Sequence, residues 1–249
     1  MKTSAPRSSL NDLTGKTLQT AVLALVMASA VMTTAQAQEK VLRVAMTAAD
    51  IPRTLAAFRA AHPEHGAVTV VPVATPDADG CLESGYALAV KAMIEALVPA
   101  SRPLPLRPAR PQVTVLAPAM LTPGDVEALK DWIGAFGLTP VVLPDLADSL
   151  DGHLSGSGYS PLTEGGLPRA ALATLGQSVA TLVLGRSLAP AAEALKARTG
   201  VPDYHFPGLM GLADCDAFTQ ALSTIAGRPV PAALERQRAQ LLDAMVDAN

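Results

Sequence analysis

Residues that could do acid–base or metal chemistry gather in one polar, glycine-rich stretch, residues 144–166. This stretch includes Asp145, Asp148, Asp151, His153, Tyr159, Thr163 and Glu164. Asp151 and His153 could form an acid–base pair or bind a metal ion. Asp and Gly also stabilise ordinary turns in a solvated loop. We favour the turn interpretation and keep Asp151 and His153 as candidates for cofactor binding.

A second candidate is Gly185-Arg186-Ser187, which stands between a predicted strand and a predicted helix. Backbone N–H groups at such a point can hold an anion. Neither GxGxxG nor GxxxxGK[ST] occurs in the chain, so no phosphate-loop motif supports that interpretation. We favour a plain helix cap at Ser187 and keep Arg186 as a candidate for cofactor binding.

The other nucleophiles and bases indicate no catalytic centre. The chain lacks the G-x-S-x-G motif of serine hydrolases. We expect His62 and His65 to be solvated, and His205 to be packed or exposed rather than a ligand. Cys81 and Cys215 form no CxxC pair and no zinc spacing. A disulfide between them stays open, but we interpret both as small buried residues, and we assign no catalytic or metal-binding residue.

The elements that would position these residues are regular from residue 112 onwards. Continuous apolar runs predict strands at 113–116, 139–143, 179–184 and 201–206. Capped helices alternate with these strands; one begins at Thr122, with Pro and Asp125 in its first turn, and stops at Gly137. Strands of this kind are typical of a parallel sheet that is buried on both faces. We therefore predict an α/β fold, a doubly wound parallel sheet that forms a middle domain over residues 112–210.

The segments on either side of this domain are predicted to be incomplete. Residues 54–98 supply two helices and one β-branched strand at 67–73, too little for a sheet of their own. We expect this partial first α/β domain to pack poorly or to lean on the middle domain. Closely spaced prolines at 99–111 predict an extended linker. Residues 211–249 are predicted to be a helical connection to a further domain.

The first 37 residues have the order of zones found in secretory signals. Positive charges at Lys2, Arg7 and Lys16 precede an apolar run over residues 21–31, and Ala35-Gln36-Ala37 is a small-residue cleavage site. A buried Ala-rich helix is the alternative. The next stretch, QEKVLRVAMTAADIPR (38–53), resembles the start of mature periplasmic solute-binding proteins of the peptide-transporter type. We expect membrane contact only transiently, through this signal.

Composition limits the partners of the chain. Apolar residues make up 49% of the sequence, enough for a sizeable core, while the formal net charge is −3. No basic stripe is present, so we predict no nucleic-acid partner.

Six segments of the body share one family pattern. They are TPDADGCLESGYALAVKAMIEALV (75–98), LTPGDVEALKDWIGAFGLTPVVLPDLADSLDGHL (121–154), YSPLTEGG (159–166), SVATLVLG (178–185), PAAEALKARTGVP (190–202) and GLADCDAFTQALSTIAGRPVP (211–231). Together they resemble the nitrogenase component 1 superfamily, and most of all its N-type scaffolds for iron–molybdenum cofactor assembly. One departure is Cys215, where the family usually has Thr.

The resemblance implies a cytoplasmic scaffold on which a precursor of the iron–molybdenum cofactor matures. It also implies pairing with a homologous E subunit, contact with the nitrogenase Fe protein, and iron–sulfur clusters. Such clusters need thiolate ligands, which the family supplies mainly from a region ahead of the matched part. Neither Cys81 nor Cys215 matches a ligand motif, so we predict no cofactor for this fragment itself.

We therefore interpret the chain as a partial scaffold subunit that is inactive alone, joined to an export signal as a chimera. Two other functions stay open: an exported solute-binding protein fragment of the ABC-transporter type, and a stand-alone α/β enzyme using the 144–166 loop. The superfamily is grouped with oxidoreductases although this branch assembles a cofactor, so enzyme activity is left undecided. The location is also undecided, because the signal implies the periplasm and the resemblance implies the cytoplasm.

Overall fold

The computed structural model describes residues 51–75, 80–100, 110–147 and 165–247. The predicted signal, most of the predicted 38–53 segment, and the candidates Asp151 and His153 lie outside these ranges. Among the described helices, none combines the length and apolar character needed to cross a membrane.

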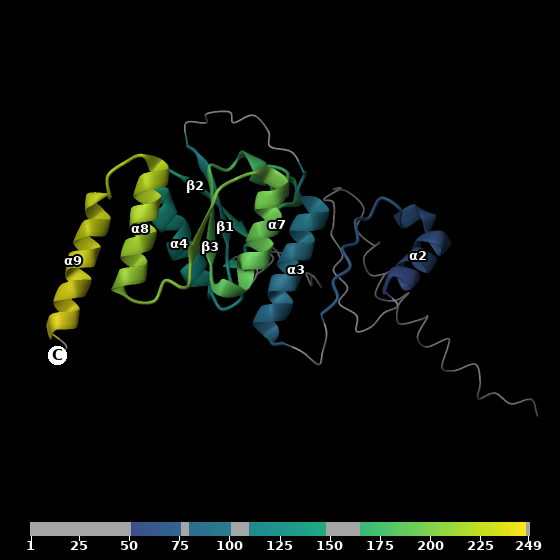
Figure 1. The fold of residues 1–249 in the computed structure, drawn as a ribbon, viewed down its shortest axis with the longest axis horizontal. Helices are drawn as coiled ribbons and strands as arrows, with labels where there is room; N and C mark the ends of the chain where they lie inside the picture. The colour runs from purple at the N-terminus through teal and green to yellow at the C-terminus, as the bar shows by residue number, and fades with distance from the viewer. Residues whose placement is uncertain (1–50, 76–79, 101–109, 148–164, 248–249) are drawn as a thin grey trace, which may run out of the picture. The chain divides into compact units, whose positions relative to one another are not determined.

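Four parallel strands form the centre of the fold (Figure 1). They are β1 (Gln112–Leu116), β2 (Thr139–Leu143), β3 (Ala180–Leu184) and β4 (Asp203–Phe206). Their spatial order is β2-β1-β3-β4. Val115 of β1 lies opposite Val142 of β2 on one side and opposite Leu182 of β3 on the other. The predicted α/β fold with a doubly wound parallel sheet is confirmed.

Helices cover both faces of this sheet (Figure 1). One face carries α4 (Pro123–Ala135) and α8 (Leu212–Ala226), and the other carries α3 (Leu82–Leu97) and α7 (Ala189–Thr199). Alternate residues of β1 divide between the faces. Val113 and Val115 pack with α4 and α8, whereas Leu116 packs with α3 and α7. Burial on both faces explains why the strands are apolar without a polar alternation.

Helix α3 belongs to the segment 54–98 that was expected to be a partial first domain. Its Val90 and Ile94 are buried, at 1% and 0% exposure, in the same cluster as residues of α7. This part of the segment therefore leans on the central sheet. The strand predicted at 67–73 is wrong: only isolated bridges form, at Val70 and Val73. Pro72 between them has no N–H to donate to a strand ladder.

Shorter or less buried elements complete the described chain. They are α2 (Ile51–Ala61), η1 (Pro63–His65), α6 (Arg169–Leu172), η2 (Leu175–Gln177), η3 (Arg186–Leu188) and α9 (Ala232–Asp247). None of the residues of α9 is buried. Its position beside α8 in Figure 1 is fixed through partly buried Leu234 and an ion pair between Arg238 and Asp216.

The predicted start and stop of α4 are confirmed in atomic detail. The Thr122 hydroxyl accepts a hydrogen bond from the Asp125 backbone N–H at 3.2 Å. The Asp125 carboxylate in turn accepts from the Thr122 N–H at 2.9 Å, which completes a capping box. After the helix, Gly137 adopts φ +74°, a conformation that side chains rarely tolerate.

Two predictions around β3 need correction. Val179 was expected to be buried, but β3 begins at Ala180 and Val179 is 40% exposed. Its N–H donates to Gln112 O, so it joins the sheet only through its backbone. Ser187 was expected to cap the following helix, but it lies inside η3 and makes no capping bond; Gly185 is the cap residue of η3.

Candidate functional site

The direction of strand addition reverses between β1 and β3. In open parallel sheets ligands usually bind beyond the carboxyl ends of the strands at such a point. β1 is followed there by Ala117 and Pro118, and β3 by Gly185. The two loops adjoin, because a Cβ atom placed on Gly185 would lie 3.6 Å from Pro118 Cβ. Gly185 also has φ +83°, so both space and conformation favour glycine at this position.

The first turn of α3 ties these two loops together. The Ser187 hydroxyl donates a hydrogen bond to Glu83 Oε1 at 2.5 Å. The Tyr86 hydroxyl donates to the Ala117 carbonyl at 2.9 Å. Glu83 and Tyr86 are three residues apart on the helix, so both face the carboxyl edge of the sheet. We define the switch-point site as Glu83, Tyr86, Ser187 and the loops they contact.

Glu83 gives this site its electrostatic character. Its second carboxylate oxygen, Oε2, is buried and has no hydrogen-bond partner among the described residues. A buried acceptor without a partner is costly, so this oxygen favours a ligand that donates a hydrogen bond. The same carboxylate disfavours an anion beside it.

The structure therefore gives no support to an anion at Gly185-Arg186-Ser187. The Gly185 N–H already donates to Phe206 O at 2.9 Å, which joins the ends of β3 and β4. The Arg186 side chain is exposed at the start of η3. Arg186 lies at the rim of the switch-point site, where it stays a candidate for contact with a ligand.

Of the polar loop predicted after β2, the structure describes the beginning. Asp145 Oδ2 pairs with Lys130 Nζ at 2.6 Å, and Asp145 Oδ1 accepts a hydrogen bond from the Ala147 N–H at 3.3 Å. These contacts give Asp145 a structural role at the end of β2. The acid–base interpretation of Asp151 and His153 stays a prediction, since neither residue is described.

The described histidines contact nearby carboxylates at the surface. His205 Nε2 lies 2.8 Å from Asp203 Oδ2, and the same carboxylate contacts Lys196. His62 Nδ1 lies 3.0 Å from Glu64 Oε1. His62 and His205 are exposed and His65 is partly exposed, in agreement with their expected solvent contact.

The interpretation of both cysteines as buried residues is wrong. Cys81 is exposed, Cys215 is half-buried, and both thiols are free. Backbone N–H groups of Ser84 and Glu83 at the start of α3 lower the pKa of the Cys81 thiol. Burial, together with the nearby Asp216 and Asp214, raises the pKa of the Cys215 thiol.

The thiols of Cys81 and Cys215 do not fit an iron–sulfur cluster, which usually takes four thiolates. Across the ranges that the structure describes, no group of three or more His, Cys, Asp or Glu side chains is placed to hold a metal ion. No step of cluster chemistry is therefore assigned to residues of the described chain.

Sequence reasoning missed Glu83 and Tyr86. They were treated as part of an apolar helix, and their contacts lie on β1 and β3, far away in the sequence. The available signal was a charged residue and a tyrosine at i and i+3 at the beginning of the helix. That pattern indicates two side chains directed to one place, but not where that place is.

A family model described as "Nitrogenase component 1 type Oxidoreductase" matches residues 44–249. The chain belongs to the nitrogenase component 1 type oxidoreductase family. The match begins ahead of residue 54, inside the segment 38–53 that resembles solute-binding proteins. The expected superfamily resemblance is thus confirmed over most of the chain.

Two curated relatives of this chain within the family are both NifN proteins. The Nitrogenase iron-molybdenum cofactor biosynthesis protein NifN of Klebsiella pneumoniae is 42% identical over 200 residues, covering 80% of this chain and 43% of that protein. NifN of Nostoc sp. is 40% identical over 200 residues, covering 80% of this chain and 44% of that protein. The chain therefore spans less than half the length of these curated relatives.

A solved structure of the same family shares the fold. The structure described as "Nitrogenase Cp1 at pH 6.5" matches with a TM-score of 0.72 and 25% identity. The match covers 94% of this chain and 49% of that chain. The sheet and its flanking helices thus follow a component 1 type architecture.

Proposed function

We propose that this chain is a partial N-type scaffold subunit for biosynthesis of the nitrogenase iron–molybdenum cofactor, inactive alone. The observation that carries the proposal is its 42% identity to NifN of Klebsiella pneumoniae over 80% of the chain. The described fold supports it, because the sheet and its flanking helices follow a component 1 type architecture.

The proposed partners are a homologous E-type subunit and, through the assembled complex, the nitrogenase Fe protein. The iron–sulfur clusters and the cofactor precursor would be held by that complex, since Cys81 and Cys215 do not supply a cluster's ligand set. We also propose that the body works in the cytoplasm with these partners.

Capture by the E-type subunit tests the proposal. The full chain is expressed in a nitrogen-fixing bacterium that lacks its own NifN, and a tagged E-type subunit is purified anaerobically. We expect the chain to co-purify without restoring growth on dinitrogen. Ile133→Asp, which puts a charge into the core of α4, should not co-purify. Failure of the unsubstituted chain to co-purify, although folded and abundant, would reject the proposal.

A further inference from the structure

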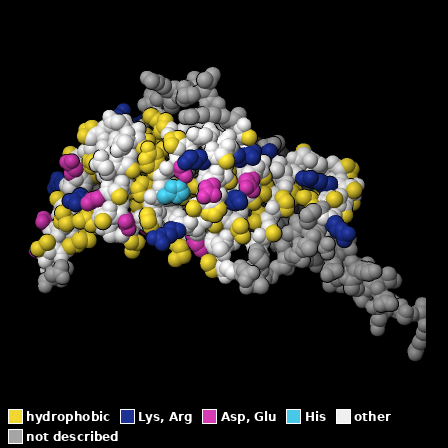
Figure 2. Space-filling model, in the orientation of Figure 1, with side chains coloured by type: hydrophobic (Ala, Val, Ile, Leu, Met, Phe, Trp, Pro, Cys, Tyr) yellow, Lys and Arg dark blue, Asp and Glu magenta, His cyan; other side chains and the backbone are white. Residues whose placement is uncertain are grey.

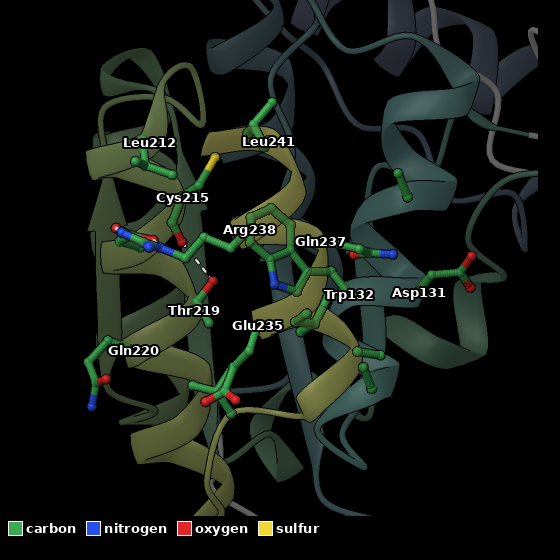
Figure 3. A pocket seen from close by; sticks show the side chains of 16 residues that line it. Asp131, Trp132, Leu212, Cys215, Thr219, Gln220, Glu235, Gln237, Arg238 and Leu241 are labelled. Atoms are coloured by element: carbon green, nitrogen blue, oxygen red, sulfur yellow. Dashed lines mark hydrogen bonds and ion pairs between the residues drawn. The ribbon is translucent and has the colours of Figure 1, made fainter. Parts of the chain in front are cut away.

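A cavity of about 770 Å³ lies between α4, α8 and α9 (Figure 3). Small-molecule sites commonly have volumes of this size. Helix α9 forms one side of the cavity, and none of its residues is buried. Figure 3 shows the Trp132 indole, which projects from α4, in the middle of the lining side chains.

The inner wall of the cavity is mostly apolar. It includes Ala128, Ala135, Leu212, Val230, Leu234 and Leu241. The Trp132 ring is held in place by an edge-to-face contact with Phe218, with ring centroids 5.1 Å apart. A ligand in the cavity would therefore meet an aromatic surface.

One polar atom of this wall is unsatisfied. Trp132 Nε1 is buried and has no hydrogen-bond partner among the described residues. Indole nitrogen is a donor only, and a buried donor without an acceptor is unusual in folded proteins. Because Nε1 is covered in the unbound chain, a small rotation of the Trp132 ring would bring it to the cavity, where a ligand atom that accepts from it removes the cost of leaving this donor unpaired.

The charged side chains at the rim of the cavity restrict the charge that a ligand can carry. Arg238 binds Asp216 through two hydrogen bonds of 2.7 Å, so these two charges offset each other. The other lining carboxylates, Asp131 and Glu235, have no ion-pair partner within the described ranges. The rim is therefore net negative, which favours neutral or cationic ligands over anions.

We propose that this cavity is a binding site for a neutral or cationic, mostly apolar small molecule that presents a hydrogen-bond acceptor to Trp132 Nε1. The site lies on α4, α8 and α9, whereas the switch-point site is built on β1, β3 and α3. The proposal does not depend on the scaffold function, and a negative capture experiment leaves it unaffected.

Three probes of similar size test the chemistry: acetophenone, ethylbenzene and benzoate. The full chain has a single tryptophan, so one indole N–H signal in a ¹H–¹⁵N NMR spectrum reports the site directly. We expect acetophenone to shift this signal and to bind about five- to tenfold more tightly than ethylbenzene, because only the ketone accepts the hydrogen bond. Benzoate should bind most weakly.

Two variants distinguish the contribution of the hydrogen bond to ligand affinity from the contribution of the cavity space. Trp132→Phe keeps an aromatic wall without the N–H, so calorimetry should show equal affinities for acetophenone and ethylbenzene. Ala233→Phe places a ring at the wall of the cavity and should weaken binding of both probes while keeping Trp132 as a reporter. Leu82→Ala, on exposed α3 surface, is the control and should bind as the unsubstituted chain does.

Four outcomes would overturn the proposal. They are an indole signal that no probe moves, equal affinities for ketone and hydrocarbon in the unsubstituted chain, tighter binding of benzoate than of acetophenone, and unchanged binding in Ala233→Phe. Ala233→Phe decides the question if Trp132→Phe fails to fold.

Discussion

Asp203 contacts Lys196 and His205 at the beginning of β4. Its Oδ1 lies 2.6 Å from Lys196 Nζ and its Oδ2 lies 2.8 Å from His205 Nε2. Burial raises the pKa of this carboxyl, but the hydrogen bonds from Lys196 and His205 outweigh that effect, and the pKa falls below its ordinary value of 3.8. The ionised form is therefore favoured by folding.

This depressed pKa predicts a pH-dependent contribution to the free energy of unfolding. The contribution is complete above pH 3.8, the ordinary value, and is lost as the pH falls through the lower pKa of the folded state. Asp203→Asn should destabilise the chain by about 1 kcal/mol or less at neutral pH, since both partners are about half exposed. Its urea midpoint should also change less with acidification. An identical acid profile for variant and unsubstituted chain, measured by urea titration at several pH values, would contradict this account.

The two thiols lead to a prediction about iron. Cys81 and Cys215 differ in exposure and have opposite pKa shifts, so they do not behave as a matched pair of ligands. We expect anaerobic reconstitution of the purified chain to yield well short of one iron–sulfur cluster per molecule, by iron and sulfide analysis. A near-stoichiometric cluster that disappears in Cys81→Ala or Cys215→Ala would show the opposite.

At the scale of elements, the capping box of α4 is the clearest case in which neighbouring residues determine where a helix begins. Thr122→Ala removes the hydroxyl that accepts from the Asp125 N–H and donates to the Asp125 carboxylate, so we expect a loss of about 1 kcal/mol in the free energy of unfolding. Thr224→Ala is the matched control, since Thr224 lies exposed inside α8 and bonds only to its own helix. That variant should be neutral or slightly stabilised, because Ala is the better helix former. Equal destabilisation of the two variants in urea would exclude a specific capping effect.

This cap also shows what could be predicted from the sequence. Thr122, Asp125 and Gly137 act through neighbours within a few residues, so their roles could be inferred from spacing alone. The strands could also be predicted from short stretches of sequence, because burial on both faces requires a continuous run of apolar residues in each strand.

The switch-point site could not be predicted in this way. Ser187 has the residue type and position of a cap, but its hydroxyl bonds to Glu83, 104 residues away in the sequence. Tyr86 likewise contacts Ala117, 31 residues away. Such contacts depend on how α3 packs against the sheet, and no local pattern specifies that packing.

At the scale of the whole chain, charge is distributed rather than concentrated. On the face drawn in Figure 2, Lys and Arg side chains alternate with Asp and Glu over the described residues. Binding to nucleic acid needs a continuous basic surface, and the absence of a nucleic-acid partner stays a prediction from the sequence. A protein partner is compatible with this distribution of charge.

The predicted signal gives a test of location for the whole chain. The three zones of a signal occur in order, so the first residues predict export and cleavage after Ala37, whereas the proposed scaffold role requires the chain to stay in the cytoplasm. Leu25→Arg, which interrupts the apolar zone, should keep the chain uncleaved in the cytoplasm. Cell fractionation with N-terminal sequencing measures both. Recovery of intact Met1 from the cytoplasm, without a periplasmic pool, would instead favour the cytoplasmic location of the proposed scaffold.

The last prediction concerns whether α3 is part of the folded unit despite the Pro-rich segment that precedes β1. Val90, Met93, Ile94 and Val98 are all buried in the cluster shared with α7, and Arg198 Nε donates to the Val98 carbonyl at 2.7 Å. Buried side chains of this size are each worth about 1.5–3 kcal/mol, so together they should hold α3 without a covalent link.

A cleavage site inserted after Leu106 allows this to be measured. After complete cutting by the matching site-specific protease, we expect both fragments to elute together in gel filtration and to melt in one transition. Ile94→Asp should release the N-terminal fragment on cutting, because it places a charge in the contact with α7. Leu88→Asp, on the exposed side of the same helix, should not. Separation of the fragments from the cut but otherwise unsubstituted chain would show that α3 is held only by its linker, and that residues 54–98 are a separate unit.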